Sequence, residues 1–161
     1  MKAKRIVLEY DIEFRYTLIG ISSSLKSFRL IHFLNKNLNT GFIKLPDMEY
    51  NISRKTFLTT SCYHYYNDIH KNNWIFFANK SEQGPPLIPK YKALDYFILI
   101  DDEVADDYIV QIKEALRTIK KLNFANIVNT TLVNDINQLY SDIELHIMSF
   151  YKKIKEKKHL W

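Results

Sequence analysis

The fold of this chain is decided by one stretch, Leu87-Ile88-Pro89-Lys90-Tyr91-Lys92-Ala93-Leu94-Asp95-Tyr96-Phe97-Ile98-Leu99-Ile100. A proline-marked segment leads through an Asp-Tyr pair into an unbroken apolar run. A short apolar run next to turn residues is typical of a strand that is buried on both faces. We therefore expect residues 96–100 to form the central strand of a sheet.

Length and composition indicate one globular domain. The chain has 161 residues, of which 47% are hydrophobic and 14% aromatic, so intrinsic disorder is a poor description. We expect a single domain over 1–161, with 134–161 as a candidate C-terminal helical appendage. Only three glycines occur, and no GxGxxG or GxxxxGK[ST] pattern is present, which argues against a phosphate-binding loop.

The chain shows no targeting or membrane segment. The basic N-terminus, residues 1–5, is followed by three apolar residues and then Glu9, which is too short for a signal-peptide core. No apolar run approaches the length of a membrane span. Cys62 is the only cysteine, so no disulfide within the chain is expected. We expect a cytoplasmic protein without a membrane partner.

The net charge of +5 and the pI near 9.1 suggest nucleic-acid binding, but only weakly. Lysine outnumbers arginine 18 to 5, whereas bidentate phosphate and base contacts favour arginine. Lysine, asparagine, isoleucine and tyrosine are all abundant and all have A/T-rich codons. Base composition therefore explains part of the positive charge.

Periodicity predicts an α+β fold. Three consecutive strands without a helical crossover favour a largely antiparallel sheet of about five or six strands. We expect two helices to cover this sheet, one near 24–39 with Ser22–Ser24 as its N-cap cluster and one near 102–122 with Asp101 and Asp102 as its caps. The predicted strands are 4–10, 42–45, 55–66, 74–78, 96–100 and 124–133, with a turn at 67–73.

A further helix is predicted over roughly 135–157. Its apolar residues are spaced 4-3-4-3-4, as in a heptad seam: Ile136, Tyr140, Ile143, Ile147, Phe150 and Ile154. Such a seam pairs with its own copy, with another protein or with the body of the fold. The lysine-rich tail at 152–158 suits acidic partners, RNA or an anionic membrane surface on one interpretation, and a solvated helix end on the other.

The segment at 88–96 resembles the one that names the IPExxxVDY family, small bacterial proteins of unknown function. Ile88, Pro89, Asp95 and Tyr96 match that name, whereas Lys90 replaces its Glu and Leu94 replaces its Val. The resemblance covers roughly residues 4–125 and implies a small cytoplasmic protein without an established activity.

Asp95 and Tyr96 of this motif have two interpretations. In one they belong to a functional site, with Asp95 as a base or ligand beside the loop that Pro89 shapes. In the other, which we favour, Pro89 makes the entry rigid, Asp95 accepts backbone N–H bonds from the loop and Tyr96 begins the buried run. Lys90 reverses the charge of the family's Glu, so chemistry that needs that carboxylate cannot operate here.

Two other groups of residues are candidate sites. Cys62 and His64 share one face of a predicted strand, and His64, Asp68 and His70 flank a bend, but their spacing matches no known nucleophile pair or metal site. We therefore assign no catalytic residue, metal ligand or cofactor. Four aromatic residues suggest a base-stacking surface, although aromatics in adjacent strands usually pack in a core: Tyr63, Tyr65, Tyr66 and Trp74.

Three functional hypotheses remain. The leading one is a non-enzymatic protein-interaction module that contacts an unknown protein, or its own copy, through the C-terminal helix or the aromatic sheet face. The second is an RNA-associated protein, motivated by the basic charge and the strand aromatics. The third is an enzyme or small-molecule binder built around Asp95 or His64.

Overall fold

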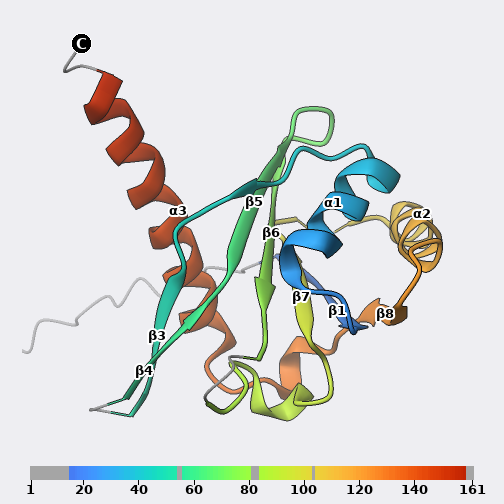
Figure 1. Ribbon diagram of the computed structural model, residues 1–161, viewed down its shortest axis with the longest axis horizontal. Coiled ribbons are helices and arrows are strands. Elements are labelled where there is room, and N and C mark those ends of the chain that lie inside the picture. Colours follow the sequence, from blue (N-terminus) through green and yellow to red (C-terminus); the bar gives the residue numbers. More distant parts are fainter. Residues whose placement is uncertain (1–14, 54–55, 81–83, 103, 159–161) are drawn as a thin grey trace, which may run out of the picture.

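The computed structural model describes residues 15–53, 56–80, 84–102 and 104–158 (Figure 1). The predicted strand at 4–10 lies outside these residues. Within them the chain forms three α-helices, a six-stranded sheet and a separate two-stranded sheet. The predicted α+β class with a C-terminal helix is confirmed.

The six-stranded sheet has the order β2-β5-β6-β7-β1-β8, and every pair of neighbours is antiparallel. Strand β7 is central, as the apolar run predicts, and its bounds of Tyr96–Ile100 agree with the prediction. The strands of this sheet are β1 (Thr17–Ser23), β2 (Ile43–Lys44), β5 (Cys62–Asn67), β6 (Asn72–Ala78), β7 and β8 (Leu122–Ile127).

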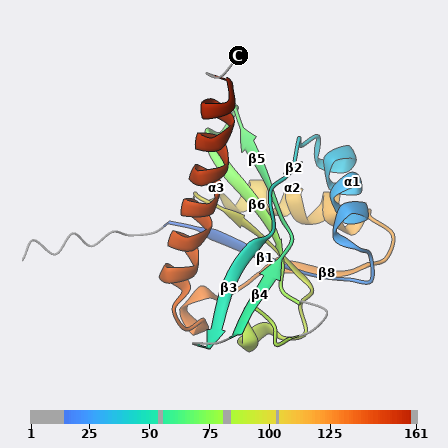
Figure 2. The same ribbon diagram turned by 60° about the vertical axis from the view of Figure 1, so that its left-hand side comes forward.

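Helices cover both faces of this sheet. Helices α1 (Ser27–Leu38) and α2 (Asp106–Arg117) lie on one side, and α3 (Ile136–Lys158) lies on the other (Figures 1 and 2). Each face therefore has its own apolar core, one with α1 and α2 and one with α3. The sheet is the middle layer of three.

The side-chain alternation of β7 explains why both faces need a cover. Ile98 and Ile100 belong to the core under α1 and α2, whereas Phe97 and Leu99 belong to the core under α3. All four side chains are at most 1% exposed. Successive residues of a strand point to opposite faces, so an unbroken apolar strand requires apolar partners on both sides.

The hairpin of β5 and β6 follows the prediction. Its register pairs Cys62 with Phe77 at one end and Asn67 with Asn72 at the turn. The side chain of Asn67 accepts hydrogen bonds from the N–H groups of Ile69 and His70, at 3.0 and 3.1 Å, which closes the turn locally.

The predicted single strand at 55–66 is wrong. The chain changes sheets at Ser61, because β4 (Thr56–Thr60) pairs with β3 (Met48–Ser53) and only β5 enters the large sheet. The N–H of Ala78 donates to the carbonyl of Ser61, so the backbone stays bonded through the change. Strand β3 was not predicted, since periodicity does not show where a strand changes its partner.

The helix starts also differ from the predictions. Helix α1 begins at Ser27 because β1 continues to Ser23, whose hydroxyl donates to the carbonyl of Lys121 at 2.8 Å instead of capping the helix. Lys26 is the N-cap and makes no side-chain cap bond.

Phe28, predicted on the buried stripe, is 61% exposed. Ala105, rather than an aspartate, is the N-cap of α2.

The last strand ends earlier than predicted. Strand β8 stops at Ile127, and a short 3-10 helix follows at Thr130–Leu132. The side chain of Asn129 accepts the N–H of Thr131 at 3.1 Å, and this local turn replaces the end of the predicted strand at 124–133.

Helix α3 packs on the body of the fold, which was one of the three predicted uses of its seam. Tyr140 and Ile143 are 3% and 1% exposed in the second core, and Ile136, Ile147 and Phe150 pack against it. The lysine-rich end of the helix, residues 152–158, is largely exposed. Of the helices in the described part of the chain, none has the length and apolar character needed to cross a bilayer.

We predict that Gly20→Ala destabilises the fold by about 1–3 kcal/mol. A Cβ atom at Gly20 would lie 2.8 Å from Cγ2 of Val128 and closer still to Cδ1 of Leu94. Urea unfolding measures the change in free energy. The control is Gly41→Ala, whose Cβ meets only the Tyr65 ring at 3.8 Å. Equal stabilities of the two variants would contradict the close packing at β1.

Candidate functional site

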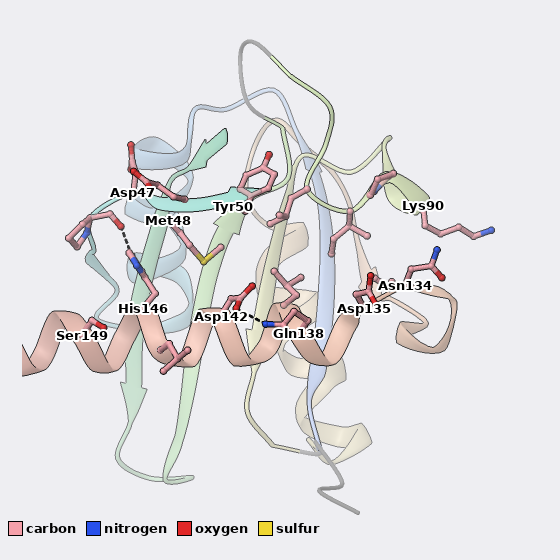
Figure 3. A pocket seen from close by; sticks show the side chains of 18 of the residues that line it. Asp47, Met48, Tyr50, Lys90, Asn134, Asp135, Gln138, Asp142, His146 and Ser149 are labelled. Carbon is pink, nitrogen blue, oxygen red and sulfur yellow. Dashed lines mark hydrogen bonds between the residues drawn. The ribbon is translucent and has the colours of Figure 1, made fainter. Parts of the chain in front are cut away.

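A groove of about 1340 Å³ lies between β3 and α3 (Figure 3). Figure 3 shows Asp142 and His146 projecting from α3 towards β3, and Met48 projecting from β3 towards α3. The loop at 87–90 and the residues before α3 close one end of the groove. Segments from three distant parts of the chain therefore build this feature.

The edge of β3, rather than one of its faces, lines the groove. Three consecutive residues of β3, Met48 to Tyr50, contribute to the lining, although alternate residues of a strand point to opposite faces. Pro46 and Asp47, which lead into the strand, line the groove as well. Among the residues that the structure describes, β3 pairs with β4 alone, and no residue of β4 lines the groove. No other described strand pairs with the edge of β3 that faces the groove.

The groove has an apolar base and a fixed wall. Met48 and Ile88 are 3% and 1% exposed, and Leu139 of α3 packs in the same core. Nε2 of His146 donates to the carbonyl of Pro46 at 2.7 Å, which joins α3 to the segment that leads into β3. This contact fixes the distance between α3 and the start of β3 at that end of the groove.

The lining of the groove has a surplus of carboxylates. Asp47, Glu49, Asp135 and Asp142 line it together with two lysines, Lys90 and Lys153. The amine of Lys44 neutralises Asp47 at 2.6 Å from outside the groove. The remaining acids are exposed, so they interact with whatever enters. This local charge is opposite to the net charge of +5 of the chain.

A second groove, of about 890 Å³, lies between the start of α1 and β4. Phe28 and Phe57 line it and are 61% and 64% exposed. Lys26 also lines it, and Lys80 forms an ion pair with Asp95 at 3.0 Å there. This groove combines exposed aromatic rings with lysine side chains.

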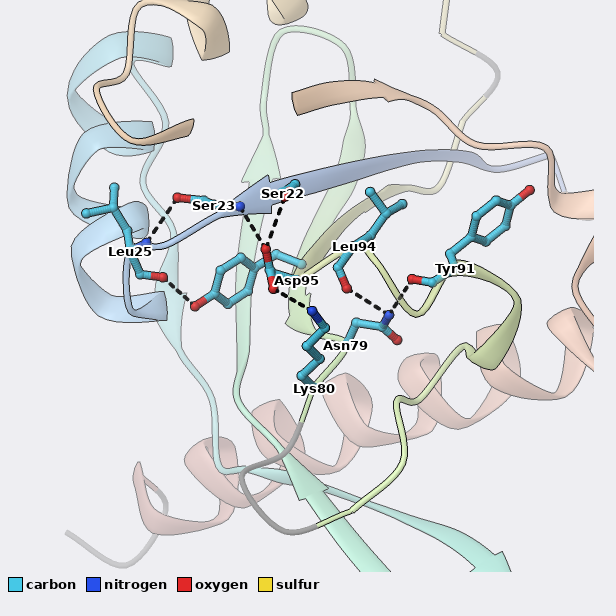
Figure 4. Close-up of polar contacts among 9 residues, drawn as sticks. Ser22, Ser23, Leu25, Asn79, Lys80, Tyr91, Leu94 and Asp95 are labelled. Carbon is cyan, nitrogen blue, oxygen red and sulfur yellow. Dashed lines mark hydrogen bonds and ion pairs between the residues drawn. The ribbon is translucent and has the colours of Figure 1, made fainter. Parts of the chain in front are cut away.

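The motif residues Asp95 and Tyr96 make structural contacts (Figure 4). The Asp95 carboxylate accepts the N–H of Ser23 at 2.9 Å and pairs with Lys80, and the Tyr96 hydroxyl donates to the carbonyl of Leu25 at 2.6 Å. These bonds agree with the favoured interpretation of Asp95 as an acceptor of backbone N–H bonds. The donor lies at the end of β1, however, and not in the loop before the motif.

Asn79 organises the loop that carries Ile88 and Pro89. Its side-chain oxygen accepts the N–H of Ile88 at 2.7 Å, and its amide donates to the carbonyls of Tyr91 and Leu94 at 3.0 and 2.9 Å. Asn79 is fully buried. Sequence reasoning missed this residue, although an amide directly after the apolar run of β6 is the signal that points to it.

The four predicted surface aromatics do not form an exposed platform. Trp74 and Tyr63 are 1% and 7% exposed in the core beneath α1 and α2, and Tyr65 packs against that core. Tyr66 is 46% exposed, but it lies on the same face of β5 as His64. Tyr63 and Tyr65 point to the other face. A base-stacking surface made of these residues is therefore wrong, because packing across the sheet uses their rings.

Cys62, His64, Asp68 and His70 do not converge on a site. Burial raises the pKa of the Cys62 thiol to about 12, so its reactive thiolate form is scarce at neutral pH. The ring of His70 contacts Tyr108 instead, with 4.5 Å between the ring centres. Within the described part of the chain, no three His, Cys, Asp or Glu side chains gather as a metal site would need.

His64, which is buried, belongs to a partly buried chain of polar groups that was not predicted. The Asn73 amide donates to Asp101 at 2.8 Å, so the Asn73 oxygen accepts the proton of His64 Nε2 at 2.7 Å. Nδ1 is then the acceptor for the Tyr151 hydroxyl at 2.6 Å. Since Tyr151 lies on α3, this chain fastens the helix to β5 and β6. Burial lowers the pKa of His64, against the opposing effects of Asn73 and Asp101.

No family model, curated protein or solved structure matches this chain. The resemblance of residues 88–96 to the IPExxxVDY segment therefore stays a prediction. The groove is the candidate functional site on the strength of its geometry alone.

We predict that Asn79→Ala lowers the free energy of unfolding by about 2–4 kcal/mol, because buried backbone groups of the loop lose their partners. Asn79→Asp keeps the acceptor for Ile88 but loses both donors, so it should also destabilise. Urea unfolding is the measurement. The control, Asn123→Ala, changes an exposed asparagine and should shift stability by less than about 0.5 kcal/mol. A similar small shift for Asn79→Ala would contradict the assigned role.

We predict that His64 makes folding less favourable as the pH falls below about 6.5. Below this pH the His64 side chain of the unfolded chain binds a proton. In the folded protein the same side chain stays neutral, because burial lowers its pKa. The loss therefore grows from about pH 6.5 down to the lowered pKa. Urea unfolding at pH 7.5 and 5.5 should show a smaller loss for His64→Gln than for the wild type. His32→Gln, at an exposed position, should match the wild type. Coincident profiles for wild type and His64→Gln would refute the prediction.

Proposed function

We propose that this protein is a non-enzymatic protein-interaction module whose groove binds an extended segment of a partner protein. The segment adds a strand to the open edge of β3, with α3 as the facing wall. The observation that carries the proposal is the lining of the groove by three consecutive residues of β3, Met48 to Tyr50, together with the two residues that precede the strand, away from β4. Main-chain bonds to such an edge provide affinity, and the adjoining groove provides selectivity.

The geometry of the groove supports a peptide better than a small molecule. It is open and elongated, and it follows both β3 and about four turns of α3, from Gln138 to Lys153. A buried apolar base beside a polar rim is also the usual anatomy of a protein interface. The exposed Leu145 side chain, at 61%, extends the apolar surface on the α3 side.

RNA association is the second candidate, and a different surface supports it. The acidic lining of the main groove repels phosphate, whereas the second groove presents Phe28, Phe57 and Lys26. Exposed rings beside lysines suit the stacking of single-stranded bases. An enzyme has less support, because the Cys62 thiol is buried and both ring nitrogens of His64 are hydrogen-bonded.

The family and the cell compartment also stay proposals. The matches at Ile88, Pro89, Asp95 and Tyr96 support membership in the IPExxxVDY family. The cytoplasm is our proposed location, because the single cysteine is a free thiol, which suits a reducing compartment.

A phage-displayed library of random dodecapeptides tests the proposed function. We expect peptides that bind the wild-type protein and bind Leu145→Arg at least about tenfold more weakly, a loss of about 1.4 kcal/mol. Val110→Arg is the matched control, because it places the same charge at an exposed apolar position of α2. Its affinity should stay within about twofold of the wild type.

Two further readouts separate the hypotheses. Amide hydrogen exchange within residues 47–50 should slow when the peptide binds, since strand addition protects those N–H groups that point away from β4. Peptides that bind both arginine variants equally, or that leave these amides unprotected, would refute the proposal. An RNA oligonucleotide that binds in a salt-dependent way and is lost with Phe28→Ala would favour the second candidate.

A further inference from the structure

We infer that the segment bound by the groove is basic, with lysine or arginine side chains at alternate positions of an extended strand. This inference rests on the proposed function and adds the chemistry of the partner. Its basis is the distribution of charge on the two sides of the groove. Glu49 on β3 and Asp142 on α3 are exposed carboxylates that line the same groove.

The acidic part of the groove is its middle. Figure 3 places Lys90 at the end where Asn134 and Asp135 lie, whereas Asp142 lies farther along α3. Lys153 lines the opposite end, one turn beyond Ser149. A segment that runs along β3 therefore passes carboxylates in the centre and meets lysines only at the ends.

The same carboxylates disfavour a second copy of this chain as the occupant. An open strand edge readily pairs with its own copy in an antiparallel arrangement. A symmetric pair centred on Met48 would set Asp47 opposite Glu49, and one centred on Glu49 would set Glu49 opposite itself. Like charges directly opposite each other destabilise a strand pair. A basic strand of a different protein meets complementary charge in either register.

Strand geometry also defines the pattern of the partner. Alternate side chains of an added strand lie about 7 Å apart on one face, and the residues between them point to the other face. Basic side chains at positions i and i+2 therefore share one face of the added strand and point to the same wall of the groove. The intervening positions suit β-branched or aromatic residues, which favour extended backbone.

The sequences of the selected dodecapeptides provide the first test. We expect lysine or arginine at alternate positions in those peptides whose binding Leu145→Arg weakens. The double variant Glu49→Lys/Asp142→Lys should bind them at least about tenfold more weakly. Glu114→Lys/Asp106→Lys is the control, since it makes the same charge change at exposed positions of α2. Replacing the basic residues of a peptide with glutamate should restore its binding to the groove double variant.

The outcomes distinguish this inference from the proposed function. Groove-dependent peptides that are neutral or acidic, and that bind the groove double variant normally, would overturn the inference and leave strand addition intact. If no peptide depended on the groove, both would fail. A basic peptide whose affinity stayed unchanged between 50 and 300 mM salt would also contradict the inference, because exposed charge pairs are screened by salt.

Discussion

The central constraint in this structure is that β7 is apolar on both faces. A sheet built around such a strand must be covered on both sides, since leaving either face in water loses most of the free energy of burial. Helices α1 and α2 cover one face, and α3 covers the other. The position of α3 follows from this requirement, and the groove exists because α3 then lies opposite β3.

Polar side chains at the two ends of β7 join it to its neighbours. Asp95 accepts a backbone N–H from Ser23, at the end of β1, and Asp101 accepts one from Asn73 in β6. Beyond Asn73 the polar chain continues through His64 to Tyr151 on α3. Asp95, Asp101 and His64 thus hold the three layers of the fold together.

The groove combines a strand edge with a charge opposite to that of the whole chain. Its two long walls come from β3 and α3, which are about 90 residues apart in the sequence. In the interaction that we propose, the edge provides main-chain hydrogen bonds to an extended segment, and the carboxylates select among segments by charge. Under this proposal, the strand edge provides affinity and the carboxylates provide specificity.

The sequence by itself determined the α+β class, the central strand at 96–100, the hairpin after Cys62 and the helix that begins near Ile136, because these depend on local periodicity and turn residues. It did not determine the change of partner at Ser61, the burial of Trp74 or the role of Asn79. Those depend on contacts between segments that are distant in the chain, as does the groove. Local patterns record which side chains prefer burial, but only the tertiary structure decides which surfaces stay open, because an edge or a face is closed by whatever other segment packs on it.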